Sequence, residues 1–191
     1  MGVCWIDVTV EVMSVVPDSI SEGLLVLFVG FNPSPASTAA GHPYAHRSNR
    51  FYKILYSSGL TPILHLPSDS RRLRTLYGYG FTNIVARTTQ RADELTKEDY
   101  DGGRQILIRK LHRYRPKIVC FVGKTVYNKY SLKRRSTFGF QDRPLIPEVY
   151  EFVGPATSGL VRMAFDEQVS IYGELSDFLN SIRATDYHPP C

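Results

Sequence analysis

Asn32 is the first residue whose type and position could do chemistry, because it lies in a short, stiff loop after the apolar run 24–29. Gly30 lets the backbone leave that run in an unusual conformation, and Pro33 and Pro35 restrict the backbone of the loop. A neutral amide is no strong general base, but its carbonyl oxygen can orient a water and its nitrogen can donate hydrogen bonds. Asn32 is therefore a candidate for holding an attacking water. The alternative is a turn asparagine beside proline.

Two further loops carry groups that could bind a planar base. Tyr44 could stack on such a base, or it could be a loop tyrosine packed on the core. His42, two residues earlier, could protonate a leaving group or bind a phosphate, and a satisfied structural histidine is the alternative. Asn83 and Thr89 flank the end of the apolar run 81–85. The asparagine side chain offers the donor and acceptor that the edge of a pyrimidine requires, or it caps a loop.

The segment Ser158-Gly159-Leu160-Val161-Arg162 comes after the apolar run 148–153 and could contact a nucleic-acid backbone. Its small residues permit close approach, Leu160 could wedge into a base stack, and Arg162 could clamp a phosphate. Small residues and a leucine also occur in many loops of other proteins. The basic run Lys133-Arg134-Arg135 has two similar interpretations, a phosphate contact or an ordinary solvated face.

Short strands alternating with helices must position these loops. The strands are expected at four apolar runs, namely residues 24–29, 81–85, 117–122 and 148–153. The first and third are continuous and rich in Val, Leu and Phe, as in a sheet covered on both faces. The pattern predicts an α/β fold, a single three-layer domain with a four-stranded, mainly parallel central sheet flanked by helices. In such sheets ligands bind outside the carboxyl ends of the strands, where the candidate loops lie.

Three helices are expected from their caps and apolar faces. Ser48 or Asn49 caps the first, which ends at Gly59, and Thr96 with Asp99 resembles a capping box at the start of the second. Asp166 opens the third. The residues expected to face inward are Phe51, Ile54, Leu55 and Ser58 in the first helix, Ile106, Leu107, Leu111 and Tyr114 in the second, and Val169, Tyr172, Leu175, Leu179 and Ile182 in the third.

The composition is that of a soluble intracellular domain with a modest basic excess. Hydrophobic residues make up 43% and charged residues 21% of the 191, which excludes wholesale disorder. Lys and Arg number 23 against 18 Asp and Glu, and the resulting net charge of +5 suits an anionic partner. Three widely separated cysteines fit neither a zinc nor an iron–sulfur site, and we expect no membrane association.

Signatures of several other chemistries are absent from the sequence. It contains no Walker-type phosphate loop, no His-Glu-x-x-His metal motif and no nucleophile elbow around a serine. Paired carboxylates with an evident relation are also lacking, which weakens any hydrolase scheme built on two acids.

Taken together, the segments resemble the mismatch-specific uracil/thymine DNA glycosylases, the thymine-DNA glycosylase-like branch of the uracil-DNA glycosylase superfamily. The resemblance covers residues 17 to 182, and many short motifs occur in register. They include Gly30-Phe31-Asn32-Pro33, Gly41-His42-Pro43-Tyr44, Asn49-Arg50-Phe51-Tyr52, Gly80-Phe81-Thr82-Asn83, Arg87-Thr88-Thr89, Gly102-Gly103-Arg104, Gly123-Lys124 and Ser158-Gly159-Leu160.

The resemblance implies a role for each matching residue. Asn32 would position the attacking water, Tyr44 would stack on the flipped base and Asn83 would hydrogen-bond its edge. Thr89 would lie near the sugar or the water, and Phe31 and Ser37 would complete the substrate site. On the DNA side, Leu160 would fill the gap left in the duplex and Arg162 would contact the backbone, together with Ser158 and Gly159. Family members of this kind need no metal or cofactor.

Three positions depart from the family pattern. The glycine usual after Asn-Pro is Ser34 here, with Pro35 next to it, so the water-holding loop is expected to differ. Pro43 replaces a second histidine of thymine-DNA glycosylases, which puts activity on oxidised cytosines in doubt. Ser37 agrees with the bacterial mismatch enzyme, where the eukaryotic ones have alanine. Uracil and small damaged pyrimidines are therefore favoured over thymine.

The expected protein is a monofunctional DNA glycosylase of base excision repair, acting as a monomer on double-stranded DNA with a mismatched or damaged base. We expect it in the nucleus if the source is a eukaryote, and otherwise in the cytoplasm. Residues 17–183 would form the glycosylase domain, 1–16 a peripheral segment and 184–191 a disordered tail. Two alternatives stay open: a catalytically degenerate protein that binds mismatches or abasic DNA, and an α/β domain acting on free nucleosides.

Overall fold

A computed structural model of the chain describes residues 16–185, which form a five-stranded sheet. The strands are β1 (Val26–Gly30), β2 (Tyr79–Asn83), β3 (Ile118–Val122), β4 (Gly139–Phe140) and β5 (Tyr150–Gly154). Their order is β2-β1-β3-β5-β4, and all pairs are parallel except β4 with β5. The predicted mainly parallel α/β sheet is confirmed. The expected number of four strands is corrected to five, because the two-residue β4 has no apolar run to indicate it.

Each predicted strand overlaps an observed one, with ends that differ by up to two residues. The largest shift concerns β2, which was expected at residues 81–85 and ends at Asn83. Ile84 and Val85 still donate backbone hydrogen bonds to Gly30 and Phe31 of the neighbouring segment, at 2.9 and 3.0 Å. The pairing therefore continues past both strand ends, and these two apolar residues are buried without belonging to the strand.

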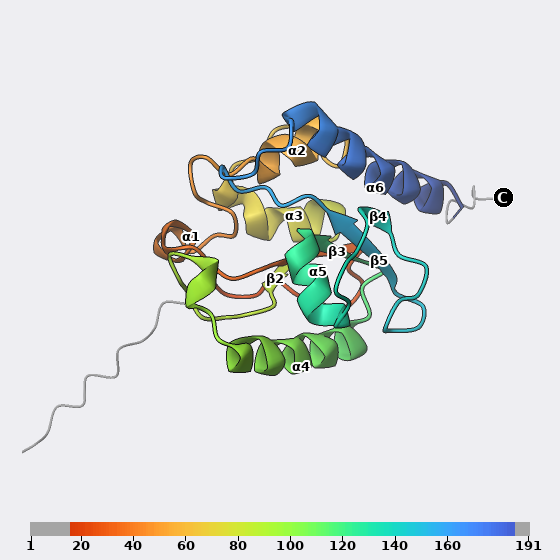
Figure 1. Cartoon of the computed structure of the whole chain (residues 1–191). Helices are drawn as coiled ribbons and strands as arrows, with labels where there is room; N and C mark the ends of the chain where they lie inside the picture. The colour runs from red at the N-terminus through yellow and green to blue at the C-terminus, as the bar shows by residue number, and fades with distance from the viewer. Residues whose placement is uncertain (1–15, 186–191) are drawn as a thin grey trace, which may run out of the picture.

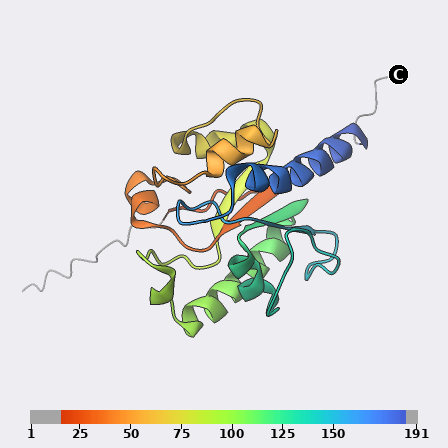
Figure 2. The same ribbon diagram turned by 45° about the horizontal axis from the view of Figure 1, so that its top comes forward.

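Helices cover both faces of the sheet (Figures 1 and 2). On one face lie α2 (Phe51–Ser57), α3 (Ser70–Tyr77) and α6 (Phe165–Thr185), and on the other α4 (Lys97–Tyr114) and α5 (Lys124–Ser131). The short α1 (Pro35–Ala40) comes after β1. Two 3₁₀ turns precede α3 and α4, at Pro67–Asp69 and Ala92–Glu94.

The alternation of side chains along β1 divides the buried apolar residues into two cores. Val26 and Phe28 belong to the core beneath α2, α3 and α6, whereas Leu27 and Val29 belong to the one beneath α4 and α5. Phe28 makes edge-to-face contacts with Phe51 and Tyr79, a favourable geometry for aromatic pairs. Both faces of the sheet are thus buried, as the continuous apolar runs predicted.

The predicted helix starts are confirmed in part: the N-cap of α2 is Arg50 and not Ser48 or Asn49, and α6 begins at Phe165, one residue before Asp166. Thr96 and Asp99 form a complete capping box at the start of α4, each side chain bonding the other's backbone N–H. One predicted inward-facing residue was wrong, because Ile106 is 46% exposed. Leu107 and Leu111, four residues apart, face the sheet, and a neighbour of Leu107 is rotated about 100° away from that face.

The predicted outer segments fall mostly outside the described residues. Of the expected peripheral segment 1–16 the structure describes Val16, which is buried, and of the expected tail 184–191 it describes the last two residues of α6. No helix within residues 16–185 is long and apolar enough to cross a membrane.

β1 lies between its two successors in the sheet, because β2 pairs on one side of it and β3 on the other. β1 leads to β2 through α2 and α3 on one face of the sheet, and β2 leads to β3 through α4 on the other face. The connections that leave these neighbouring strand ends therefore diverge, which opens a crevice at that edge. The loops that carry Asn32, Asn83 and the segment after β5 all begin at this edge.

Candidate active site

A cavity of about 530 Å³ lies at the carboxyl ends of the parallel strands. Its wall is formed by the loop after β1, the segment around Pro43 and Tyr44, Asn83, the start of α5, and the loop after β5. Cavities of some 300–1,000 Å³ with mostly apolar walls and a few polar groups are typical of small-molecule sites. The volume and position suit a single nucleotide base.

The amide of Asn32 lines this cavity and has a defined orientation. Its Nδ2 donates to the backbone carbonyl of Arg87 at 3.0 Å and to Oγ1 of Thr89 at 2.8 Å. Because a backbone carbonyl can only accept, the nitrogen must face Arg87. Both nitrogen-bound hydrogens are then used, and Oδ1 is left as an acceptor. An acceptor held in this way can orient a water molecule.

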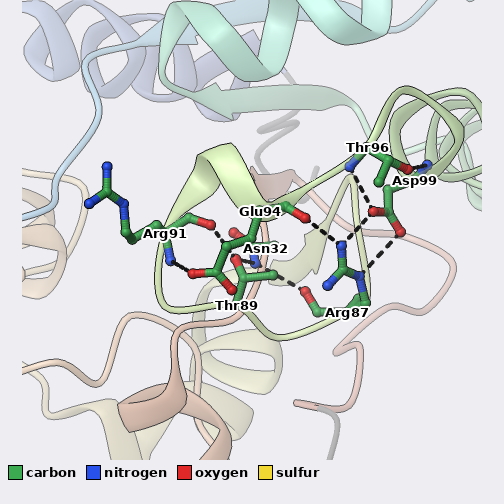
Figure 3. A network of polar contacts seen from close by, with 7 residues as sticks. All are labelled: Asn32, Arg87, Thr89, Arg91, Glu94, Thr96 and Asp99. Atoms are coloured by element: carbon green, nitrogen blue, oxygen red, sulfur yellow. Dashed lines mark hydrogen bonds and ion pairs between the residues drawn. The ribbon is translucent and has the colours of Figure 1, made fainter.

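Thr89 lies behind Asn32, away from the cavity wall. Its buried hydroxyl accepts from Asn32 and donates its one hydrogen to the carbonyl of Arg91 at 2.8 Å. Figure 3 shows these contacts within a larger network that extends to Asp99 at the start of α4. The structure therefore brings Thr89 to Asn32, and its hydroxyl hydrogen is used by the carbonyl of Arg91 in this arrangement.

Ser34 and Pro35, the departures after Asn32-Pro33, form the start of α1. Ser34 is the N-cap, its Oγ accepting from the backbone N–H of Ser37 at 3.2 Å, and Pro35 occupies the first turn, where its missing N–H costs nothing. The Ser34 hydroxyl also donates to Oγ of Ser37 at 3.1 Å, which accepts from the N–H of Ala45 as well. Ser37 is buried and lines the cavity. The two replacements thus build a regular helix start that holds Ser37.

Tyr44 offers an aromatic face to the cavity. Its ring stacks on Phe51 with centroids 4.0 Å apart and an interplanar angle of 17°. Because Phe51 covers one face, the opposite face is the one that a planar ligand can contact. Tyr44 has a φ of +55°, an unusual conformation for a bulky residue and one that is concentrated at functional sites. Burial raises the pKa of its hydroxyl well above the usual value, so the phenol stays neutral.

Asn83 ends β2 directly beside Gly30, its register partner at the end of β1. A Cβ atom on residue 30 would collide with Oδ1 of Asn83 and would lie 3.1 Å from the hydroxyl oxygen of Tyr44. Glycine at this position lets both polar groups approach the floor of the cavity. The structure thereby brings Asn32, Ser37, Tyr44 and Asn83 around one volume, together with Phe31.

The loop after β5 contributes Ser158 to the cavity wall, whereas Gly159, Leu160 and Arg162 lie outside it. Leu160 is 93% exposed, the highest value among the large exposed hydrophobic residues of the described chain. A Cβ on Gly159 would collide with the side chain of Ser48, so this loop closely approaches the segment before α2. An apolar side chain held in solvent beside a base-sized cavity is suited to contact a partner.

Arg50 and Gln168 hold the loop after β5 in place through hydrogen bonds to its backbone carbonyls. Arg50 donates its backbone N–H to the carbonyl of Thr157 at 2.8 Å and its guanidinium to the carbonyl of Met163 at 3.2 Å. The guanidinium also reaches Oε1 of Gln168 at 3.3 Å, and the buried Gln168 donates to the carbonyl of Ala156 at 2.9 Å. Sequence reasoning missed this pair, since the partners lie more than a hundred residues apart.

Lys124 was also missed, although Gly123-Lys124 was among the matched motifs. Within the described chain it is the one side chain with a formal charge that lines this cavity, and its Nζ lies 3.9 Å from the centroid of the Phe138 ring. A ring face attracts a cation without neutralising it. Asn49, likewise on the wall, accepts from the N–H of Phe51 through Oδ1, just before α2.

Two predicted candidates lie elsewhere. His42 is absent from the cavity wall and its Nδ1 lies 3.1 Å from Oγ of Ser70, which favours the structural interpretation. In the basic run, Lys133 is bound to Tyr127, with Nζ 3.3 Å from its hydroxyl, and Arg134 and Arg135 are exposed. Within residues 16–185 no group of three His, Cys, Asp or Glu side chains could hold a metal ion.

A comparison with models of protein families matches residues 17–176 of this chain to the model described as the uracil DNA glycosylase superfamily. The matched region contains the whole sheet, every residue of the cavity wall and the loop that carries Leu160.

Proposed function

Since the chain belongs to the uracil DNA glycosylase superfamily, we propose that it is a monofunctional DNA glycosylase that hydrolyses the N-glycosidic bond of uracil in G·U mismatches. Membership of the family supports glycosylase activity on uracil in DNA. The finer proposal, a mismatch-specific enzyme of the thymine-DNA glycosylase-like type, is supported by the motifs in register along the sequence. The product is an abasic site.

The orientation of Asn32 carries the proposal. Hydrolysis of the bond needs a water molecule placed beside C1′ of the flipped nucleotide, and Oδ1 of Asn32 is an acceptor at the cavity wall with its direction fixed by two hydrogen bonds. Asn32 cannot remove a proton as a strong base would. Its contribution is orientation of the water, and catalysis relies on how readily the base departs.

The rest of the cavity fits the base that departs. The free face of Tyr44 would stack on a pyrimidine, and the Asn83 amide would hydrogen-bond the polar edge of the base. Negative charge develops on the leaving base as the bond breaks, and Lys124 is a cation in the cavity wall that would stabilise it. Ser37 in the wall supports a preference for uracil over thymine, in line with its identity in the bacterial enzyme.

A base can enter the cavity only after it leaves the duplex. Flipping is least costly at a mismatch, where pairing is already weak. The exposed Leu160 would fill the resulting gap in the stack, and Arg162, Ser158 and Gly159 would contact the DNA backbone.

Single-turnover excision tests the proposal directly. Wild type and Asn32→Ala are incubated with an end-labelled duplex that carries one G·U pair, and alkali then cleaves any abasic site. We expect cleavage with wild type and a rate at least about 100-fold lower with Asn32→Ala, at similar affinity for DNA. Equal loss of binding and excision would contradict the role of Asn32.

The same assay separates the two alternatives. Tight mismatch binding without cleavage by wild type would identify a degenerate binding protein. Release of uracil from free deoxyuridine in preference to the duplex would identify an enzyme of free nucleosides.

A further inference from the structure

The segment between β2 and α4 determines which way the amide of Asn32 faces. Both acceptors of its Nδ2 belong to this segment, the carbonyl of Arg87 and the hydroxyl of Thr89. Apart from the single turn at Ala92–Glu94, the segment from residue 84 to 96 has no helix or strand of its own. Something other than regular backbone hydrogen bonding must therefore keep its carbonyl groups in place.

The side chain of Arg87 supplies one such restraint, beside the contact of Thr88 Oγ1 with Oγ1 of Thr38 at 2.7 Å. Its Nη2 donates to Oδ2 of Asp99 at 2.7 Å and its Nε to Oδ1 of the same carboxylate at 3.3 Å. A further bond from Nη2 reaches the carbonyl of Glu94 at 2.8 Å. Arg87 thus holds Asn32 through its backbone and Asp99 through its side chain, and it ties the start of the segment to its end (Figure 3).

Asp99 is itself fixed, because it belongs to the first turn of the 18-residue helix α4. It accepts from the N–H of Thr96 at 2.9 Å within the capping box, so its carboxylate has a defined position. The helix is closely packed on the segment as well, since a Cβ on Gly103 would collide with the carbonyl of Ile84. Arg87 therefore connects the water-holding amide to a rigid element of the fold.

We propose that the Arg87–Asp99 ion pair is a positioning device for Asn32, one that keeps Oδ1 of the amide turned toward the cavity. The inference rests on the function proposed above, because it assigns the pair to the same hydrolytic step. Neither residue lines the cavity, so both act through Asn32 and not on the substrate.

The two-point contact explains why arginine is needed. A planar guanidinium binds both oxygens of a carboxylate in one orientation, whereas a lysine ammonium binds as a point charge. Arg87→Lys keeps the charge and loses the orientation. We expect it to slow excision, whereas a purely electrostatic contribution to folding would be largely kept.

Matched substitutions separate positioning from a general effect of charge. Asp99→Asn removes one partner of the pair, and Asp93→Asn makes the same change at the exposed carboxylate that pairs with Arg91 in the same segment. Small displacements of a positioned group cost on the order of 10- to 100-fold in rate, so we expect a loss in this range for Arg87→Ala and Asp99→Asn. DNA affinity should stay within about twofold in each, and Asp93→Asn should match wild type.

Combination with Asn32→Ala tests whether the pair acts through the amide. Once Asn32 is alanine, Arg87→Ala should lower the residual rate by less than about twofold, because no amide is left to position. An equal loss in both backgrounds would overturn the proposal, as would a loss in Asp93→Asn equal to that in Asp99→Asn.

Nuclear magnetic resonance gives a readout that does not depend on activity. With Asn32 assigned by comparison with Asn32→Ala, its two Nδ2 hydrogens should give separate, exchange-protected signals in wild type and in Asp93→Asn. In Arg87→Ala and Asp99→Asn the signals should shift toward those of a free amide, with the remaining backbone spectrum retained. Unchanged signals would overturn the positioning role. If wild type fails to release uracil, the proposed function fails while this measurement still decides the orientation.

Discussion

Gly30 and Asn83 end neighbouring strands at the same level, and the amide oxygen of Asn83 occupies the space in which a side chain of residue 30 would lie. The hydroxyl of Tyr44 borders the same space. Because residue 30 has no Cβ, the Asn83 amide and the Tyr44 side chain, both proposed to contact the base, can occupy these positions. The residue at the end of β1 therefore determines whether the Asn83 amide can reach its position in the proposed base site.

Gly30→Ala should displace the Asn83 amide and lower the rate of uracil excision. The colliding atom is the end of the Asn83 side chain, which lines the cavity, so the amide can turn away and we expect the rate to fall more than the stability. Single-turnover rates and urea unfolding are the measurements. Gly102→Ala in α4 is the control, because a Cβ there meets nothing within 4 Å and alanine is the better helix former. Equal rates for the two variants would contradict the proposed role of the contact.

Leu160→Ala should weaken retention of abasic product and binding to the mismatch, with little effect on stability. The side chain is 93% exposed, and truncation of such a residue usually changes the free energy of unfolding by no more than about 0.5 kcal/mol. The dissociation rate of the abasic product measures retention, and thermal unfolding measures stability. Leu66→Ala, at another exposed leucine, is the control and should leave product retention unchanged. A large fall in thermal stability of Leu160→Ala would contradict the DNA-contacting role.

Features with a local origin could be predicted from the sequence. The strands appear as apolar runs, and the Thr96–Asp99 capping box is set by residues three apart. Asn32 and Asn83 could be singled out because polar residues after strands of a parallel sheet meet at one edge. By contrast, α3 was not predicted, because it is short and largely polar, with Leu73 as its one buried large apolar side chain among several arginines.

Features that depend on the folded chain could not be predicted. The contact between Arg50 and Gln168 joins residues 118 positions apart, and no local pattern indicates which polar side chain will hold a distant loop. Thr89 lies behind Asn32 because of the path of residues 84–96, a segment with only a single turn of regular structure. No local sequence pattern predicts such a path. Lys124 belonged to a matched motif, but its place in the cavity wall results from how α5 begins at the end of β3.

Stability should fall at high pH because buried tyrosines resist ionisation in the folded chain. Burial raises the pKa of Tyr79 to about 12, whereas an unfolded tyrosine titrates near pH 10. Its contribution is fully present below about pH 10 and is lost as the pH rises toward 12, because the unfolded state releases the proton first. Urea unfolding from about pH 9 to about pH 12 should show this decline, and a smaller one in Tyr79→Phe. Equal pH dependence in both proteins would contradict it.

Lys124→Met should slow excision most for the poorest leaving group. By Coulomb's law, two opposite unit charges about 8 Å apart at an effective dielectric constant near 20 attract by about 2 kcal/mol, or roughly 30-fold in rate, and we expect a loss of no more than this size. The loss should be smaller for 5-fluorouracil, which departs more readily than uracil. The single-turnover rate for 5-fluorouracil divided by the rate for uracil should therefore increase. A role confined to DNA binding would instead change both rates by the same factor and alter the salt dependence of the affinity.

Lys129→Met is the matched control for this prediction. Lys129 belongs to the same helix and also lies over an aromatic ring, with Nζ 4.0 Å from the centroid of Tyr100, but it is exposed and outside the cavity wall. We expect it to keep the wild-type rates for uracil and 5-fluorouracil. If both lysine substitutions changed the ratio alike, the effect would come from the charge or packing of α5 as a whole, and the stabilisation of the leaving base would have to be assigned to another group.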